Sequence, residues 1–444
     1  MTSPRIVIVD NDDGSAVVYH ALFGNPRRID GPVKVLLDQL REPVEISSLP
    51  LDSDDGLDAL SELLEIGFVV EVTQAKRERD VWRERIAASQ TDGPLLSEGL
   101  CLMVTAQCNL DCSYCVARQS MASGAHMSQI TACTALDQFM AHRASAYAHR
   151  PVELLFSGGE PLMNFKVIES LCDYAADRYP DTVFRHKIVT NGTLVSAKVA
   201  RFLAERRFRV VVSMDGEAAG HDSRRYHKTG RPTHAGVFSG IDTLLAAGID
   251  RDRVTVSAVF DEQLPDNLSE AFLSALAERK IHSLDLNLDN TVMPRTPPEV
   301  LAEIFLALFR RAKRFGIVLG GRWTAPSHLI QHGGVALASC SGVLRNKVFI
   351  QQNGTMTLCD YHPEPIGSVE RYDDYAATAA SDRARQMAGT YTMCAGCPIE
   401  GFCTPCLLEL DVFHKDNPAF IQHRCAFLRR ITNGLLGELA KVAA

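Results

Sequence analysis

The chain has 444 residues, of which 46% are hydrophobic and 23% are charged, a composition typical of a soluble globular protein with two or three domains. No apolar run is long enough to cross a bilayer, and the start of the chain does not resemble a signal peptide, so we expect a cytoplasmic protein that does not enter a membrane. The net charge of -8 provides no basic footprint and argues against nucleic-acid binding.

Residues 1–75 form an acidic module, with 14 acidic and 5 basic residues, whereas the rest of the chain is almost balanced. Residues 6–9 and 16–23 predict strands around a turn-rich segment, and residues 68–72 predict a closing strand. Leucines at helical spacing predict helices around residues 33–40 and 57–64. This winged-helix-like α+β pattern resembles, in topology alone, the recognition (RRE-like) domains that bind leader peptides during ribosomal-peptide maturation. A packing or dimerisation domain is the competing interpretation.

Residues 76–99 predict a helical linker, and residues 100–320 predict strands that alternate with helices. Six such units imply a parallel sheet with helices outside it, curved into a partial (β/α)6 TIM-like barrel rather than a closed barrel of eight. Functional loops are then expected at the carboxyl ends of the strands. The predicted strands are 101–105, 152–156, 186–190, 210–214, 254–259 and 284–288, and helices such as 166–176, 196–205 and 236–247 separate them.

The pattern changes after residue 320, where cysteines become frequent. Residues 348–350 and 355–358 flank Asn353-Gly354, a pair that favours a tight hairpin turn, and a helix is predicted over residues 418–436. Ten of the 13 cysteines fall in two groups, 108–115 and 340–425, and clustered cysteines in a reducing compartment are more often metal ligands than disulfides. We therefore interpret residues 321–444 as a small domain held together by metal.

The first cysteine group follows the first strand of the predicted barrel. Cys108, Cys112 and Cys115 are separated by three and two residues, and three such thiolates can bind three irons of a [4Fe–4S] cube. The fourth iron then lacks a protein ligand, and an open metal position is where chemistry usually happens. Structural zinc is the alternative, but it requires four ligands, and the fourth would have to come from a distant part of the chain.

This group resembles the signature of the radical S-adenosylmethionine (SAM) family, a CxxxCx(aromatic)C motif after the first strand, with Tyr114 at the aromatic position. The resemblance implies that SAM chelates the open iron through its amino and carboxylate groups. It also implies that the reduced cluster cleaves SAM to a 5′-deoxyadenosyl radical, which removes hydrogen from an unactivated carbon. The protein would position these groups and exclude water.

Further motifs lie at the ends of successive predicted strands, in the order that this family requires. The SGGEP motif resembles the segment whose Glu and backbone receive the SAM ammonium, and the SMDG motif resembles a segment whose Ser helps to hold SAM. Each motif alone is equally a structural turn or a solvated charge. The residues that the resemblance assigns to SAM are Ser157, Gly158, Gly159, Glu160, Thr190, Asn191, Ser213, Asp215 and, as a partner for the SAM carboxylate, Arg225.

The second cysteine group resembles the seven-cysteine SPASM domain, which carries two auxiliary iron–sulfur clusters. By that resemblance Cys394, Cys397, Cys403 and Cys425 hold the distal cluster, whereas Cys340, Cys359 and Cys406 hold the cluster nearer the active site. Only two residues separate Cys403 from Cys406, where the family usually has three. Three ligands leave an open iron on the nearer cluster unless Asp360 or another group fills it. One or two structural zinc ions are the alternative.

The resemblance implies a maturase that installs a thioether or carbon–carbon cross-link in a ribosomally made precursor peptide. Its partners would be that peptide with its leader and an electron donor such as flavodoxin or ferredoxin. The alternatives are formylglycine formation of the sulfatase-maturase kind, redox cofactor biosynthesis from a peptide, and a non-enzymatic iron–sulfur sensor or scaffold.

Other side chains are weaker candidates. Tyr361 and His362 follow Cys359 and are candidate proton donors. On the sixth predicted strand, the alternating polar residues Asp285, Asn287 and Asp289 would share one face. That face would be directed toward the substrate or, equally, toward solvent and helices. His328 and His332 have a metal-ligand spacing, but we favour a surface position.

Overall fold

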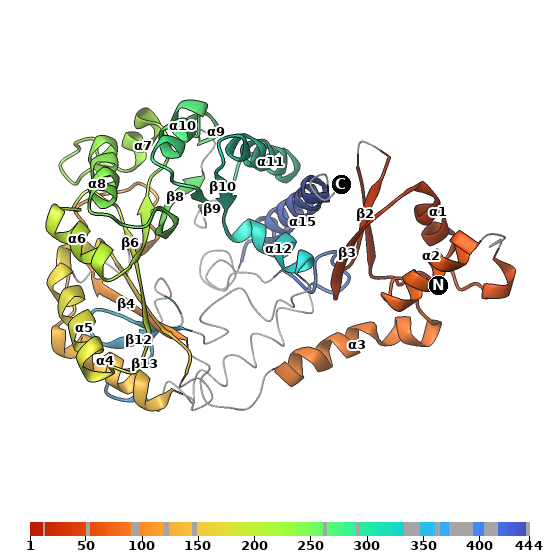
Figure 1. Ribbon diagram of the computed structural model, residues 1–444, viewed down its shortest axis with the longest axis horizontal. Helices are drawn as coiled ribbons and strands as arrows, with labels where there is room; N and C mark the ends of the chain where they lie inside the picture. Colours follow the sequence, from red (N-terminus) through yellow and green to blue (C-terminus); the bar gives the residue numbers. More distant parts are fainter. Residues whose placement is uncertain are drawn as a thin grey trace.

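The computed structural model describes residues 1–11, 14–49, 54–89, 98–118, 124–143, 149–260, 264–289, 294–332, 347–357, 359, 365–372, 394–403 and 416–440. Two sheets organise these residues: a three-stranded sheet near the N-terminus and a ten-stranded sheet that forms most of the molecule (Figure 1). Within the described part of the chain, no helix combines the length and apolar character needed to cross a bilayer.

The N-terminal module is an antiparallel meander of β1 (Ile6–Asp10), β2 (Ala16–His20) and β3 (Gly24–Ile29), covered by α1 (Gly31–Gln39) and α2 (Asp54–Glu65). Asp30 caps α1 by accepting a hydrogen bond from the backbone N–H of Val33. Buried residues from the meander and both helices form a separate small core. The prediction that one strand covers residues 16–23 is wrong at its end, because the chain turns over residues 21–23 and His20 pairs with Gly24 across this hairpin.

The predicted closing strand over residues 68–72 is reduced to a short antiparallel contact with the start of the chain. Gly67, at φ 76°, ends α2, and the backbone N–H groups of Phe68 and Val69 then donate to the carbonyl of Leu63. Val69 bridges Thr2, and the N–H of Val70 donates to the carbonyl of Met1 at 2.8 Å. The following helix, α3 (Val72–Ser89), matches the predicted helical linker but begins earlier.

The parallel barrel sheet contains the six predicted strands and one that was missed. They are β4 (Gly99–Thr105), β5 (Val152–Gly158), β6 (Phe184–Thr190), β7 (Arg209–Ser213), β8 (Val254–Phe260) and β9 (Ser283–Leu288). The missed strand, β10 (Val318–Gly320), pairs with β9 and has only three residues, too few to show a period. All neighbours from β4 to β10 are parallel, which confirms the predicted partial barrel.

Strands from the cysteine-rich region extend this sheet. β11 (Lys347–Ile350) pairs in parallel with β4, and β12 (Thr355–Thr357) and β13 (Pro365–Ser368) follow antiparallel. The predicted hairpin at Asn353-Gly354 is confirmed, with Gly354 at φ 84°. The sheet order is β10-β9-β8-β7-β6-β5-β4-β11-β12-β13, so the sheet continues past residue 320.

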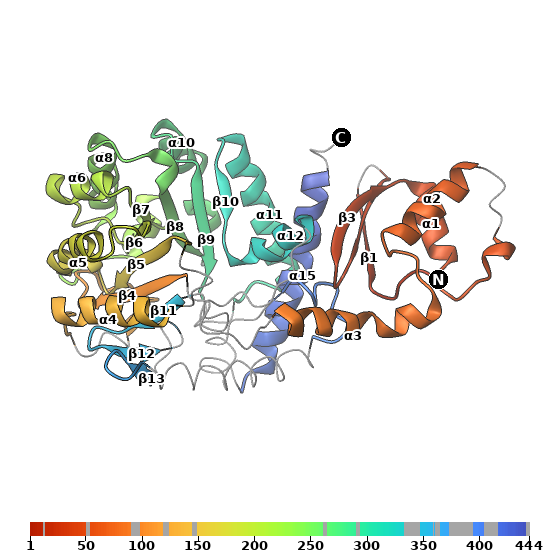
Figure 2. The same cartoon turned by 60° about the horizontal axis from the view of Figure 1, so that its bottom comes forward.

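Helices cover the convex side of the sheet (Figures 1 and 2). In β8, buried Val256 and Ala258 alternate with half-buried Thr255 and Ser257, the period of two expected for a strand. The C-terminal helix α15 (Pro418–Ala440) packs on α11, with the rings of Phe427 and Phe305 5.1 Å apart. The other helices are α4 (Gln129–His142), α5 (Phe165–Arg178), α6 (Ala197–Glu205), α7 (Ala218–Arg224), α8 (His234–Ala246), α9 (Leu264–Asn267), α10 (Glu270–Glu278), α11 (Pro298–Arg314) and α12 (Ala325–Gln331).

Candidate functional site

The first cysteine loop lies at the carboxyl end of β4 and is fixed by backbone hydrogen bonds to a distant segment. The N–H of Asp111 donates to the carbonyl of Tyr226 at 2.9 Å, and the N–H of Ser113 donates to the carbonyl of Arg224 at 3.0 Å. Leu110 forms a β-bridge with His227. The loop that carries the cysteines is therefore set by the segment after α7, not by its own sequence alone.

The three thiols of this loop suit a multi-iron cluster. Cys108, Cys112 and Cys115 are all partly exposed and influence one another electrostatically. Burial raises the pKa of Cys108 to about 12, so the ionised thiolate needs a positive partner such as iron. Among the described residues, no three Cys, His, Asp or Glu side chains surround a single-ion position. Three thiolates in one loop could each bind a different iron of a cube, whereas a structural zinc site requires four ligands.

The SGGEP segment brings the end of β5 against β4. Gly158 has φ 137°, and a Cβ atom there would lie 2.4 Å from the carbonyl oxygen of Thr105. The N–H of Gly159 donates to the same carbonyl at 2.8 Å. Only glycine permits this close approach, so the first glycine has a packing role that is independent of any ligand. Ser157 is buried in the same turn.

Glu160 is fully buried and joins the ends of β5 and β6. Its Oε1 accepts hydrogen bonds from the Thr190 hydroxyl at 2.7 Å and from the N–H of Leu162 at 3.0 Å, and its Oε2 accepts one from the N–H of Asn191 at 2.7 Å. Burial nevertheless raises the pKa of Glu160 to about 7, because it outweighs these three donors. The carboxyl group is thus held in place by three donors at the strand ends.

Asn191 extends this arrangement to the cysteine loop. Its Nδ2 donates to Oδ1 of Asn109 at 2.8 Å and lies 3.9 Å from Sγ of Cys108, while its Oδ1 accepts from the N–H of Thr193 at 3.0 Å. Asn191 therefore links Glu160, another residue of the predicted SAM set, to a predicted iron ligand.

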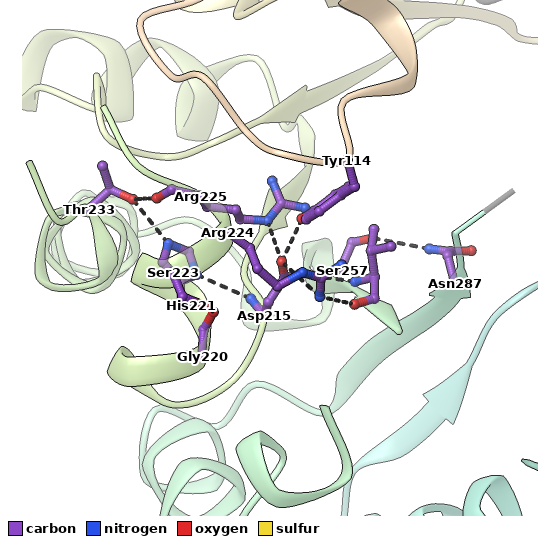
Figure 3. A network of polar contacts seen from close by, with 11 residues as sticks. Tyr114, Asp215, Gly220, His221, Ser223, Arg224, Arg225, Thr233, Ser257 and Asn287 are labelled. Atoms are coloured by element: carbon purple, nitrogen blue, oxygen red, sulfur yellow. Dashed lines mark hydrogen bonds and ion pairs between the residues drawn. The ribbon is translucent and has the colours of Figure 1, made fainter. Parts of the chain in front are cut away.

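Asp215 forms the second polar centre (Figure 3). Its Oδ2 accepts from the Tyr114 hydroxyl at 2.5 Å and from Nε of Arg225 at 3.0 Å, and its Oδ1 accepts from the N–H of Val259 at 3.0 Å. Burial alone would raise the pKa of this carboxyl group, but Arg225 and then Tyr114 hold it below its usual value. The guanidinium carbons of Arg224 and Arg225 lie 4.2 and 5.1 Å from the centroid of the Tyr114 ring.

A chain of hydrogen bonds through His221 fixes the loop after β7 (Figure 3). The N–H of Asp215 donates to Nδ1 of His221 at 3.2 Å, so Nε2 carries the proton and donates to Oγ1 of Thr233 at 3.1 Å. The Thr233 hydroxyl then donates to the carbonyl of Arg225. Burial and the nearby Arg225 lower the pKa of His221 to about 4, which keeps the ring neutral. The sequence alone does not indicate this positioning role of His221.

The polar residues of β9 share one face, as predicted. Asp285 and Asn287 are half-buried and alternate with buried Leu284 and Leu286, and Nδ2 of Asn287 donates to Oγ of Ser257 at 3.3 Å. Burial raises the pKa of Asp285. Asp289 lies beyond the strand.

Three further predicted residues lie on the surface or at a strand end. Ser213 ends β7 and is half-buried. His328 and His332 are exposed, with stacked rings 4.1 Å apart, as expected for a surface position.

The described part of the second cysteine group gathers four thiols from two segments. Cys394, Cys397 and Cys403 lie in one compact turn, and Cys425 comes from α15. Burial raises the pKa of Cys403 to about 12, and the other three thiols interact with it electrostatically. Cys359 is described and half-buried. Cys340, Asp360, Tyr361, His362 and Cys406 lie outside the described residues.

Comparisons with known proteins match the barrel region of the chain. A model of the radical SAM superfamily matches residues 102–275. The uncharacterized protein MJ0907 of Methanocaldococcus jannaschii is 32% identical over 189 residues, 43% of this chain and 62% of that protein. Radical SAM cyclopropyl synthase TigE of Paramaledivibacter caminithermalis is 23% identical over 263 residues, 55% of this chain and 54% of that protein. A serine-type anaerobic sulfatase-maturating enzyme of Bacteroides thetaiotaomicron is 29% identical over 168 residues, which are 36% of this chain and 40% of that enzyme.

The chain thus spans less than two thirds of the length of these relatives. Among solved structures, anSMEcpe with bound AdoMet superposes with a TM-score of 0.62 at 16% identity, over 78% of this chain and 100% of that one. Streptococcus suis SuiB bound to precursor peptide SuiA superposes with a TM-score of 0.54 at 15% identity, over 92% of this chain and 96% of that one. These structural likenesses support the fold, and together with the matched model and the strand-end motifs they identify residues 102–275 as a domain of the radical SAM superfamily.

Proposed function

We propose that this chain is a SAM-dependent maturase, an oxidoreductase that modifies a ribosomally made precursor peptide. The main observation behind this proposal is that hydrogen bonds connect the cysteine loop with Glu160 and Asp215 at one end of the sheet. Cys108 lies beside Asn191, Asn191 bonds to Glu160 through its backbone, and Tyr114 in the cysteine loop bonds to Asp215. Residues that follow the ends of β5, β6 and β7 thus converge on one loop of three thiols.

The residues present fit a [4Fe–4S] cluster with SAM. Cys108, Cys112 and Cys115 would hold the cluster. When bound, the cluster and SAM supply a 5′-deoxyadenosyl radical that removes a hydrogen atom from the substrate. The surrounding protein has to bind SAM in one orientation and keep water away from this reaction.

Glu160 and Arg225 are the residues that we assign to the two charged ends of SAM. A carboxyl group with a pKa near 7 is poised to become fully ionised when an ammonium group approaches it. Arg225 contacts Asp215 through Nε, which leaves its terminal amino groups for a carboxylate. Asp215, which already accepts three hydrogen bonds, would position Tyr114 and Arg225 instead of binding SAM itself. Ser213, at the end of β7, is a further candidate contact.

The second cysteine group would hold auxiliary iron–sulfur clusters of the SPASM type. Four convergent thiols, Cys394, Cys397, Cys403 and Cys425, support a distal cluster. Cys359, with Cys340 and Cys406, would hold a nearer one with an open iron. Such clusters would carry away the electron that a net oxidation of the substrate releases. The electron would pass to a redox partner protein such as flavodoxin or ferredoxin, which would also serve as the electron donor.

A cross-linked peptide is the product that we favour, either a thioether or a carbon–carbon bond. The superposition with SuiB covers 92% of this chain, whereas that with anSMEcpe covers 78%, and the wider coverage supports the interpretation of residues 1–75 as a leader-recognition module. Formylglycine formation is the second candidate, because sulfatase-maturating enzymes are among the relatives.

The test is incubation of the reduced, iron-loaded protein with SAM, followed by measurement of 5′-deoxyadenosine. We expect 5′-deoxyadenosine and methionine in equal amounts, and no cleavage would overturn the proposal. Mass spectrometry of a precursor peptide encoded beside the gene then separates the candidates. A cross-link and the oxidation of Ser to formylglycine both remove two hydrogens, so fragmentation and aldehyde trapping must accompany the mass measurement. An internal link between two residues indicates a cross-link, whereas a trapped aldehyde at a Ser or Cys residue would favour the second candidate.

A further inference from the structure

A buried carboxylate joins the N-terminal module to the second cysteine group. Glu400 lies between Cys397 and Cys403, and its side chain is 0% exposed. Its Oε2 accepts from Nη1 of Arg5 at 3.0 Å, and its Oε1 accepts from Nε of Arg79 at 3.0 Å. The N–H of Gly396, in the same turn, donates to Oε2 at 2.9 Å. A buried carboxylate needs partners of this kind, and here both cations come from the N-terminal part of the chain.

Both arginines belong to one rigid unit. Arg5 directly precedes β1, and Arg79 lies on α3. The neighbouring Glu78 fixes α3 to the module, because its Oε2 accepts from the Ser3 hydroxyl at 2.9 Å and its Oε1 lies 3.5 Å from Nε2 of His20. All three side chains are buried. The two cations at Glu400 therefore move with the module.

The backbones also meet at this junction. The N–H of Gly401 donates to the carbonyl of Ala21 at 2.9 Å, and a Cβ atom on Gly401 would lie 2.8 Å from the carbonyl oxygen of Leu22. Nearby, the Tyr19 hydroxyl donates to Oδ1 of Asn433 on α15, the helix that carries Cys425. Burial and then the charge of Cys397 raise the pKa of Tyr19, which places that ring within electrostatic reach of the thiol. The module thus contacts both segments that supply the four cysteines.

We propose that the N-terminal module forms one wall of the second iron–sulfur site, and that Glu400 is the positioning residue that couples them. The proposal rests on the auxiliary cluster proposed above. Iron bound by Cys394, Cys397, Cys403 and Cys425 fixes the turn that presents Glu400, and the module in turn fixes the turn that presents the cysteines. Such linkage is reciprocal: loss of iron loosens the module, and loss of the module contact loosens the iron.

The test compares Glu400→Gln with Glu303→Gln as a matched control. Glu303 pairs with Arg430 on the surface of α11 and α15, so the control makes the same chemical change without touching the module. Both variants are made in a protein whose Cys108, Cys112 and Cys115 are changed to Ala, so that all remaining iron belongs to the second group. The measurements are the rate of iron loss to a chelator and amide hydrogen exchange in β2 and α3.

We expect Glu400→Gln to lose iron about tenfold faster than its parent and to exchange faster in β2 and α3, with Glu303→Gln unchanged. Equal behaviour of the two variants would overturn the coupling. The reverse arm changes Cys394 and Cys425 to Ser, and protection of β2 and α3 should fall although neither segment carries a cysteine. Unchanged hydrogen-exchange protection of β2 and α3 would also overturn the proposed coupling. If the parent protein binds no iron, the auxiliary cluster itself fails, which the iron content reveals before any variant is compared.

Discussion

The two cysteine regions are held in different ways. The first is one loop after β4, and the network around it comes from the ends of neighbouring strands in a single sheet. The second joins a turn, a helix and the N-terminal module, which are far apart in the sequence. The barrel therefore preforms the first site, whereas the second depends on docking between separate parts of the chain.

Removal of the first set of ligands is expected to have the largest effect on activity. Changing Cys108, Cys112 and Cys115 to Ala should abolish SAM cleavage, because no thiolate remains to hold the cluster. Iron at the second group should persist, because the two regions share no cysteine. The measurements are 5′-deoxyadenosine formation and iron content. Complete loss of iron would show that the two regions are not independent.

Asp215 tests whether the network preforms the first site. Asp215→Asn leaves Arg225 buried without its anionic partner, which should lower the free energy of unfolding by about 3–5 kcal/mol. SAM binding should weaken together with stability. Urea denaturation and calorimetric titration with SAM measure the two effects. Asp250→Asn is the control, because its pairing with Arg253 is exposed and 3.9 Å long. Similar losses in both variants would argue against a special role for Asp215.

The pH dependence of stability tests the His221 chain. The neutral ring has a folded-state pKa of about 4, below the usual value of 6.5, so the unfolded state takes up a proton first as the pH falls. Stability should therefore decrease between about pH 6.5 and 4, by about 3 kcal/mol in total. His221→Gln should remove this part of the slope. Denaturation midpoints of both proteins from pH 7 to 4 measure it, and parallel curves would contradict the assignment.

The surface contacts of α15 should have the smallest effect. Glu303→Gln removes the ion pair with Arg430, and Glu438→Gln removes the ion pair with Arg310. Both arginine side chains are about half exposed. Each change should lower the free energy of unfolding by less than about 1 kcal/mol, because solvent screens such pairs. A thermal-unfolding series that also includes Glu400→Gln would rank the contacts. A surface variant as damaging as Glu400→Gln would remove the distinction between exposed and buried pairs.

Local patterns were sufficient to predict most of the barrel, and they placed the candidate site residues at the ends of its strands. The six strands alternate with helices, so their order and parallel pairing follow from general rules, and the motifs lie at their ends. The run over residues 68–72 pairs over a shorter stretch than predicted, because only Val69 bridges Thr2 and α3 already begins at Val72. The roles of Glu400 and His221 have no local signature in the sequence. The partners of Glu400 are distant in the chain, and those of His221 are brought together only when its loop folds.

The parallel pairing of β11 with β4 has a consequence for synthesis of the chain. Residues 347–350 cover the edge of residues 99–102, so the first barrel strand keeps an open edge until a much later segment leaves the ribosome. At typical rates of about 5–20 residues per second, that wait lasts on the order of tens of seconds. An exposed edge of apolar residues invites pairing with other nascent chains. Newly made protein should therefore depend on chaperones, or on slow translation, before any iron is inserted.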